Sequence, residues 1–218
     1  MYLSRIAINP YLPAARNMLG NTYDIHTSVM SMFTTYRKDE SGRETRRRGG
    51  SGVPLWRLDT ARDSISLLMV SGDKPHTSEF AQKYGWDDGT DGAVTVAAYD
   101  TFLESIRDGE SYSFRTTMNM ATRASDGRIK VATSYNAKTV WSYTAASLNG
   151  FSIKGVPFIE SLVDTFEKPN GDKVTLDKST VAGNLIVTDA DALRSALVAG
   201  IGRGKAYGCG LITLAPPA

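Results

Sequence analysis

Tyr23 and His26, which stand three residues apart in the segment "NTYDIHTSVMSMF", are the two side chains best suited to moving protons. Apolar residues recur around them with helical spacing, and residues three apart on a helix are neighbours on its surface. The hydroxyl and the imidazole can therefore approach one point outside the helix. Histidine titrates near neutral pH, so His26 is a candidate general acid or base.

This pair suits the cleavage of RNA without a metal ion, because the substrate supplies its own nucleophile. The 2′-hydroxyl attacks the adjacent phosphorus, and the protein has only to move protons and stabilise the charged phosphate. One well-placed acid or base gives roughly 100- to 10,000-fold, enough for a slow, single-use cut. His26 could instead be a packing residue at the edge of the apolar stripe. A metal site is not expected, because the other histidine, His76, follows Pro75 in a loop and no carboxylate spacing suggests ligands.

The second informative segment is "GIGRGKAYGCGLITLAP", residues 200–216, with five glycines in its first eleven residues. It is not a Walker loop, because Lys205 is followed by Ala206. Glycines let backbone N–H groups approach a phosphate chain. A helix stop and a tight turn would explain only Gly200 and Gly202. We therefore predict that this segment binds RNA through Gly202, Arg203, Gly204, Lys205, Gly208 and Gly210.

Two further groups of cations are candidates for RNA binding. The run "YRKDESGRETRRRGG", residues 36–50, has six basic and three acidic side chains and is predicted to be a loop. Its Arg43, Arg46, Arg47 and Arg48 could hold the scissile region, although a solvated loop is an equal alternative. The second group lies on a predicted hairpin that could enter or flank an RNA groove, and consists of Lys168, Lys173 and Lys178. We expect the protein to recognise folded RNA by its shape and its phosphates more than by every base.

The order of predicted elements in the first half is β-α-β-β-α-β. Residues 2–8 form a strand, and a helix ends near residue 33 after a cap at Asn21 or Thr22. Strands follow at residues 53–58 and 64–70, then a short helix in "TSEFAQKYG", and a fourth strand is predicted at residues 97–106.

The second half repeats this order. It contains a strand at 111–121, a helix ending at Gly150, a long hairpin at about 160–188 that turns at "KPNGD", a capped helix at 189–200 and a closing strand. The predicted fold is α+β, with two tandem ferredoxin-like (RRM-like) domains at residues 1–109 and 110–218.

The composition argues against several other classes of protein. The chain has 218 residues, 41% of them hydrophobic, and a net charge of +2. No apolar run approaches the roughly 20 residues that span a bilayer, and the N-terminus does not resemble a secretory signal. The single cysteine, Cys209, excludes an internal disulfide and a cysteine-based zinc site. We predict a cytoplasmic protein with no membrane partner and no cofactor.

The segments "MYLSRI", "YDIH" and "GIGRGKAYGCGLITLAP" resemble the CasE family, the CRISPR RNA-processing endoribonucleases of type I-E systems. The resemblance covers the whole chain. It implies a metal-independent cut at the 3′ base of the repeat hairpin, leaving a 2′,3′-cyclic phosphate and a 5′-hydroxyl. His26 falls where the family has its catalytic histidine, and Tyr23 where it has a supporting tyrosine. The resemblance also implies that the enzyme stays on its product and joins the other subunits of the Cascade complex.

Two alternatives come from other functional classes. A non-catalytic RNA-binding protein of the same fold would not need His26. A small-molecule enzyme on a ferredoxin-like scaffold would need more polar residues converging on one pocket than the sequence offers.

Overall fold

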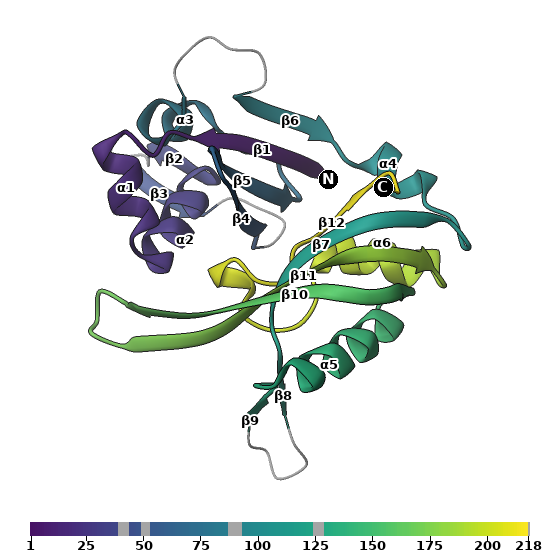
Figure 1. Cartoon of the computed structure of the whole chain (residues 1–218). Helices are drawn as coiled ribbons and strands as arrows, with labels where there is room; N and C mark the ends of the chain where they lie inside the picture. The colour runs from purple at the N-terminus through teal and green to yellow at the C-terminus, as the bar shows by residue number, and fades with distance from the viewer. Residues whose placement is uncertain (39–43, 49–52, 87–92, 124–128, 218) are drawn as a thin grey trace. The chain divides into compact units, whose positions relative to one another are not determined.

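The computed structural model describes residues 1–38, 44–48, 53–86, 93–123 and 129–217, which belong to two compact units, Met1–Tyr99 and Asp100–Ala218 (Figure 1). Each unit is built on one four-stranded antiparallel sheet. In both sheets the second and third strands form a hairpin, and the first strand lies between the third and the fourth. This order is that of a ferredoxin-like domain, so the predicted α+β fold is confirmed.

The first unit has the strand order β4-β5-β1-β6. The strands of this sheet are β1 (Tyr2–Ile8), β4 (Leu55–Ala61), β5 (Ser64–Ser71) and β6 (Val94–Ala98), and the helices of the unit are α1 (Pro13–Leu19), α2 (Thr22–Ser31) and α3 (Ser78–Tyr84). Alternate strand residues such as Ile6, Leu67 and Met69 pack with Ile25 and Val29 of α2 in one core. All three helices contribute to this core, so they cover the same face of the sheet.

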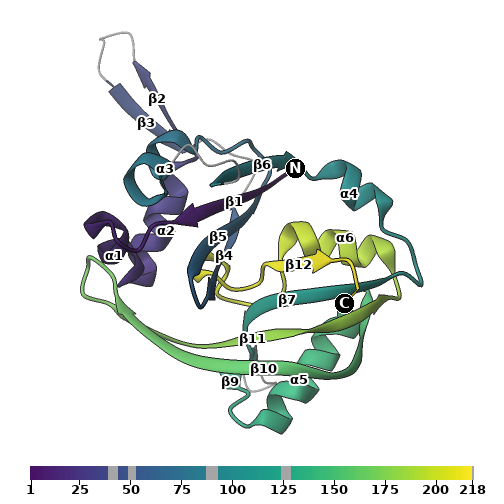
Figure 2. The ribbon, with the colours of Figure 1, turned by 45° about the horizontal axis from the view of Figure 1, so that its top comes forward.

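The second unit has the strand order β10-β11-β7-β12. Its strands are β7 (Ser111–Asn119), β8 (Ala121–Arg123), β9 (Ile129–Val131), β10 (Phe151–Glu167), β11 (Lys173–Val187) and β12 (Ile212–Ala215). Its helices are α4 (Asp100–Ser105), α5 (Tyr135–Leu148) and α6 (Ala190–Ala199), with a short 3₁₀ turn η1 (Lys205–Tyr207) in the glycine-rich segment. β7 pairs with residues 178–186 of β11 only, so the turn end of the long β10–β11 hairpin extends beyond the sheet (Figure 2).

A buried ion pair fixes α5 to this hairpin. Lys138 of α5 is 5% exposed, and its Nζ donates to Asp177 Oδ1 at 2.8 Å and to Ser161 Oγ at 2.8 Å. Both partners lie on the hairpin strands. Because an uncompensated buried charge is costly, this contact specifies where α5 lies on the sheet.

Two predicted elements are wrong. Residues 97–106, predicted as a strand, comprise the end of β6 and the helix α4. Asp100 in the first turn of α4 favours a helix start, and Arg194 of α6 binds the carbonyls at its end, at 2.8 Å to Leu103 O and 2.6 Å to Ile106 O.

The charged run at residues 36–50, predicted as a loop, contributes β2 (Thr34–Lys38) and β3 (Glu44–Arg48), which pair as a separate two-stranded ribbon (Figure 2). Thr34, Thr35 and Tyr36 have the β-branched and aromatic side chains that strands favour. The hairpin of the second unit is also longer than predicted, because β10 begins at Phe151 rather than near Glu160.

The unit boundary lies after Tyr99, whereas the predicted domains were 1–109 and 110–218. The two boundaries differ by α4 and the segment after it, which belong to the second unit. Besides the contacts of Arg194, Asp108 Oδ1 accepts the N–H of Ala190 at the start of α6, at 2.7 Å. In the part of the chain that the structure describes, no helix is long and apolar enough to cross a membrane.

Replacing Arg194 by Ala should loosen α4. Hydrogen bonds to a charged group are worth about 1.5–3 kcal/mol, so the amides of residues 100–106 should exchange with solvent about 10- to 100-fold faster. Hydrogen–deuterium exchange measures this directly, with Arg62→Ala, at an exposed turn between β4 and β5, as the control. Unchanged protection of α4 would show that Arg194 does not hold it.

Candidate functional site

Tyr23 and His26 lie on one side of α2, as the sequence predicted. Their ring centroids are 6.4 Å apart with 59° between the ring planes, and both side chains are partly exposed. The residues on the buried side of the helix are Thr22, Ile25, Val29 and Met30. His26 is thus at the border between core and solvent, with its Nδ1 on the buried side.

Contacts at both ends hold α2 in place. Asn21 is the N-cap, and its Oδ1 accepts the N–H of Tyr23 at 2.8 Å. At the other end, Met32 O accepts the backbone N–H of His76 at 2.9 Å. Between them, Ser28 Oγ donates to the hydroxyl of Tyr84 on α3 at 3.2 Å. A site on a helix fixed in this way is held more accurately than one on a loop.

The described residues contain no group of three or more His, Cys, Asp or Glu side chains placed to hold a metal ion. His76, the second histidine, is exposed in the segment before α3, and its backbone rather than its ring makes the contact with α2. Acid–base chemistry by Tyr23 and His26 is the chemistry that the arrangement on α2 offers.

The glycine-rich segment of the second unit owes its shape to left-handed backbone. Gly204 and Gly208 flank η1 with φ of 80° each, and Gly210 has φ of 90°. The segment is also closed by backbone hydrogen bonds: Ile201 N–H donates to Gly210 O at 2.9 Å, and Gly210 N–H donates to Thr117 O at 2.7 Å. The N–H of Gly210 is therefore not available to a phosphate. Gly208 and Gly210 are buried and shape the segment from within.

The predicted cations of the second unit differ in how available they are. Arg203 and Lys173 are exposed. Lys205 donates to Ala199 O at 2.6 Å and so caps the end of α6. Lys178 is 2.6 Å from Asp164 Oδ2 and mostly buried, and Lys168 is 3.8 Å from Asp172 Oδ2 near the hairpin turn. Arg203 and Lys173 can therefore reach a phosphate without breaking a side-chain contact that the structure records.

The arginine run of the first unit is placed only in part. Arg46, Arg47 and Arg48 lie on β3 opposite Tyr36, Thr35 and Thr34, while Arg43 lies outside the described residues.

The structure also brings the hairpin and the glycine-rich segment of the second unit together. The rings of Phe166 on β10 and Tyr207 in η1 have centroids 4.8 Å apart, and Asn119 at the end of β7 pairs with Arg203 through a backbone bridge. The glycine-rich segment is therefore in contact with the hairpin and with the end of β7 in the second unit, while Tyr23 and His26 belong to the first unit.

Arg115 is a candidate that sequence reasoning missed. Along β7 the buried residues alternate, with Phe114, Thr116 and Met118 toward the core. Arg115 therefore points to the opposite face, as does Thr117, whose hydroxyl meets that of Thr180 at 3.0 Å. The alternation of "SYSFRTTMN" already contained this signal.

Cys209 is a packing residue rather than a nucleophile. It is fully buried, and burial raises the pKa of its thiol to about 11, although the charge of Lys178 acts in the other direction. A Cβ on Gly204 would lie 3.4 Å from its sulfur, so the segment is closely packed around it. A thiol with so high a pKa is almost entirely protonated at neutral pH and reacts slowly.

Comparison with known proteins gives a consistent result. A family model described as "CRISPR associated protein" matches residues 1–216. The CRISPR-associated endoribonuclease Cse3 of Thermus thermophilus is 27% identical, over 99% of this chain and 100% of that protein. A structure of CRISPR endoribonuclease Cse3 bound to 19 nt RNA has a TM-score of 0.75 at 23% identity, over 99% of both chains. A chain of a CRISPR RNA-guided surveillance complex, pre-nicking, has a TM-score of 0.67 at 22% identity, over 99% of this chain and 100% of that one.

Replacing Gly210 by Ala should destabilise the second unit more than the same change at Gly171. Both glycines have positive φ, so each substitution costs roughly 1 kcal/mol. A Cβ at Gly210 would also lie 2.8 Å from Ile201 O, whereas nothing lies within 4 Å of one at Gly171. We expect a further loss of about 1–3 kcal/mol for Gly210→Ala. Urea unfolding of the two variants measures the difference, and equal losses would contradict the close packing of the segment.

Proposed function

The chain belongs to the CRISPR associated protein family, as its resemblance to CasE implied, and we propose that it is an endoribonuclease that cuts precursor CRISPR RNA at the 3′ base of the repeat hairpin. Three findings support the proposal. The family model covers residues 1–216, the curated relative of matching length is an endoribonuclease, and the fold is that of a protein with bound RNA. The observation that carries it is the Tyr23–His26 pair at the exposed border of α2.

The proposed reaction needs no metal ion and no cofactor. The 2′-oxygen of the nucleotide before the cut gives up its proton and forms a bond to the neighbouring phosphorus. The bond from that phosphorus to the 5′-oxygen of the next nucleotide breaks, and this oxygen takes up a proton. The products are a 2′,3′-cyclic phosphate and a 5′-hydroxyl, so atoms and charges balance without added water.

His26 exchanges a proton in this reaction, either as the base that accepts it from the 2′-hydroxyl or as the acid that supplies it to the 5′-oxygen. An imidazole suits both tasks because its ordinary pKa of about 6.5 lies near neutral pH. The Tyr23 hydroxyl can donate a hydrogen bond to a phosphate oxygen. This bond strengthens as negative charge develops in the transition state.

The RNA hairpin is held mainly through its phosphates in this proposal. The proposed contacts of the second unit are the exposed Arg203 and Lys173, Lys168 close to the hairpin turn, and Arg115 on the face of β7 opposite to its buried residues. Arg46, Arg47 and Arg48 on β3 are the proposed contacts of the first unit. A-form RNA hides its base edges in a deep, narrow major groove, so shape and backbone contacts dominate recognition. The product stays bound, and the protein joins the other subunits of Cascade.

Replacing His26 by Ala should slow cleavage of the repeat RNA by roughly 100- to 10,000-fold, with hairpin affinity within about threefold, since phosphate contacts dominate affinity. Tyr23→Phe should slow cleavage less, by about tenfold, because it removes one hydrogen bond to a charged group and keeps the ring. Single-turnover cleavage rates and binding to a 2′-deoxy, uncleavable hairpin are the two measurements.

The control is His76→Ala, which removes the other histidine ring and leaves the backbone contact to α2 in place. It should cleave as the wild type does. If His26→Ala also cleaves at the wild-type rate, the alternative of a non-catalytic RNA-binding protein with this fold is favoured instead.

A further inference from the structure

α5 has two faces that are suited to packing, and the second unit covers only one of them. The residues on the covered face are Lys138, Ser142, Ala145 and Ala146, which are buried. A second stripe consists of Ala137, Trp141, Thr144 and Leu148, at successive spacings of four, three and four residues. These spacings place side chains along one side of a helix, and they are the spacings at which two helices pack together.

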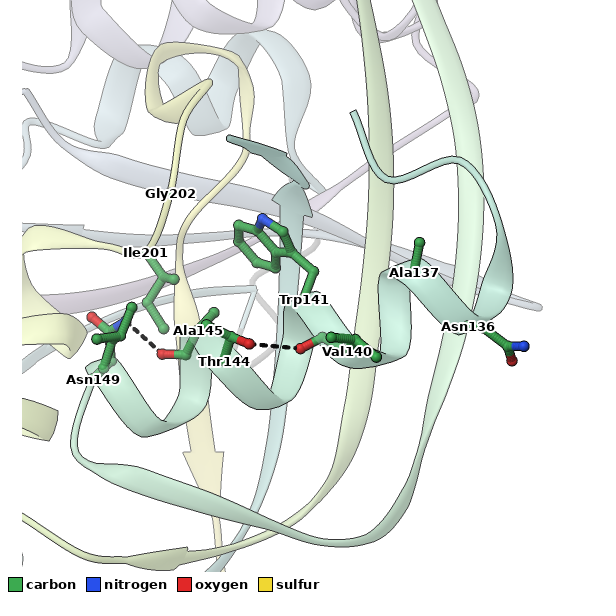
Figure 3. A pocket seen from close by; sticks show the side chains of 10 residues that line it. Asn136, Ala137, Val140, Trp141, Thr144, Ala145, Asn149, Ile201 and Gly202 are labelled. Atoms are coloured by element: carbon green, nitrogen blue, oxygen red, sulfur yellow. Dashed lines mark hydrogen bonds between the residues drawn. The ribbon is translucent and has the colours of Figure 1, made fainter. Parts of the chain in front are cut away.

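The second stripe lines an open groove of about 650 Å³, with Ile201 and Gly202 of the glycine-rich segment on its other side (Figure 3). Trp141 points from α5 toward Gly202, and a Cβ on Gly202 would lie 3.4 Å from the ring. The indole thus packs against a backbone that has no side chain at this position. The groove has fixed walls on two separate segments of the chain, which a docking site for a rigid partner needs.

The groove is apolar and exposed. Val140 and Leu148, which line it, are 65% and 78% exposed. Every residue of α5 is described, and the helix has one charged side chain, that of Lys138, which points away to Asp177. An exposed apolar patch on a helix face without charged residues is typical of a surface that another protein covers.

We propose that this groove binds an amphipathic helical segment of a neighbouring protein subunit in the surveillance complex. The inference rests on the proposed function, because it assigns a surface to the partner subunits of the same protein. The stripe from Ala137 to Leu148 is about 17 Å long at 1.5 Å per residue, which matches about three turns of a partner helix. RNA does not fit the groove, because the residues that line it offer no cation for a phosphate chain.

The test uses two variants with opposite charges. Val140→Glu and Leu148→Lys each place a charge in the groove, and each charge would lose its water when a partner helix docks. Glu is a better helix former than Val, and a cation suits the last turn of a helix, so α5 should stay folded. Val53→Glu is the matched control, because Val53 is a similarly exposed valine (61%) in the first unit.

The probe is the complex of the other subunits of the same locus, assembled on a guide RNA without its 3′ hairpin. Without this hairpin, RNA does not bridge the tested protein and the complex. Both groove variants should bind this complex at least about tenfold more weakly than the wild type, which is the loss expected for a central interface residue. The Val53→Glu protein should bind normally. All three variants should melt as the wild type does and should cleave repeat RNA at its rate.

Normal binding of both groove variants to the complex would overturn the proposal. So would a loss of hairpin RNA affinity, which would assign the groove to RNA, or the breaking of a dimer, which would assign it to a second copy of this chain. Failure of the proposed function is distinguishable, since wild-type protein would then not cleave the repeat RNA at all.

Discussion

Burial of Ile25 and Val29 in the first core is the interaction on which the account of the site depends. Each side chain stabilises the fold by about 1.5–3 kcal/mol, and together they fix the rotation of α2 about its axis. That rotation brings His26 to the border of the core, and the spacing of three residues on the same helix keeps Tyr23 beside it. A rotation by one residue, about 100°, would move both side chains together, away from the border between core and solvent. In the proposed mechanism, the position of the catalytic pair is therefore set by apolar side chains of the core.

In the second unit the corresponding constraint is the left-handed backbone of the glycine-rich segment. Its turns are closed by internal hydrogen bonds, and Cys209 fills the space beneath them. The glycines shape a segment that presents Arg203 on one part of its surface and Gly202 against Trp141 on another. One rigid segment can in this way border both the proposed RNA surface and the proposed docking groove, so that a single fold element serves both partners.

The sequence predicted what local patterns encode. The apolar spacing around His26, the cap at Asn21 and the Asn-Gly hairpin turn each act over a few residues. Local patterns of this kind were enough to predict both ferredoxin-like units. It did not predict α4, whose helical state is supported by Arg194, some ninety residues further along the chain. It also did not show that Gly210 and Lys205 are occupied by contacts within the protein. Arg115 was not predicted because it stands outside the clusters of basic residues, and only the alternation along its strand marks it.

The central claim is that the RNA supplies the nucleophile while α2 supplies the proton transfer. The most direct measurement is the cleavage, in excess EDTA, of two repeat RNAs that differ only in the 2′-hydroxyl before the cut. The account predicts that the all-ribose RNA is cut to a 2′,3′-cyclic phosphate and a 5′-hydroxyl, and that the RNA with the single 2′-deoxy nucleotide stays intact. Cleavage of the deoxy RNA at the same position, or activity that EDTA abolishes and Mg²⁺ restores, would contradict it.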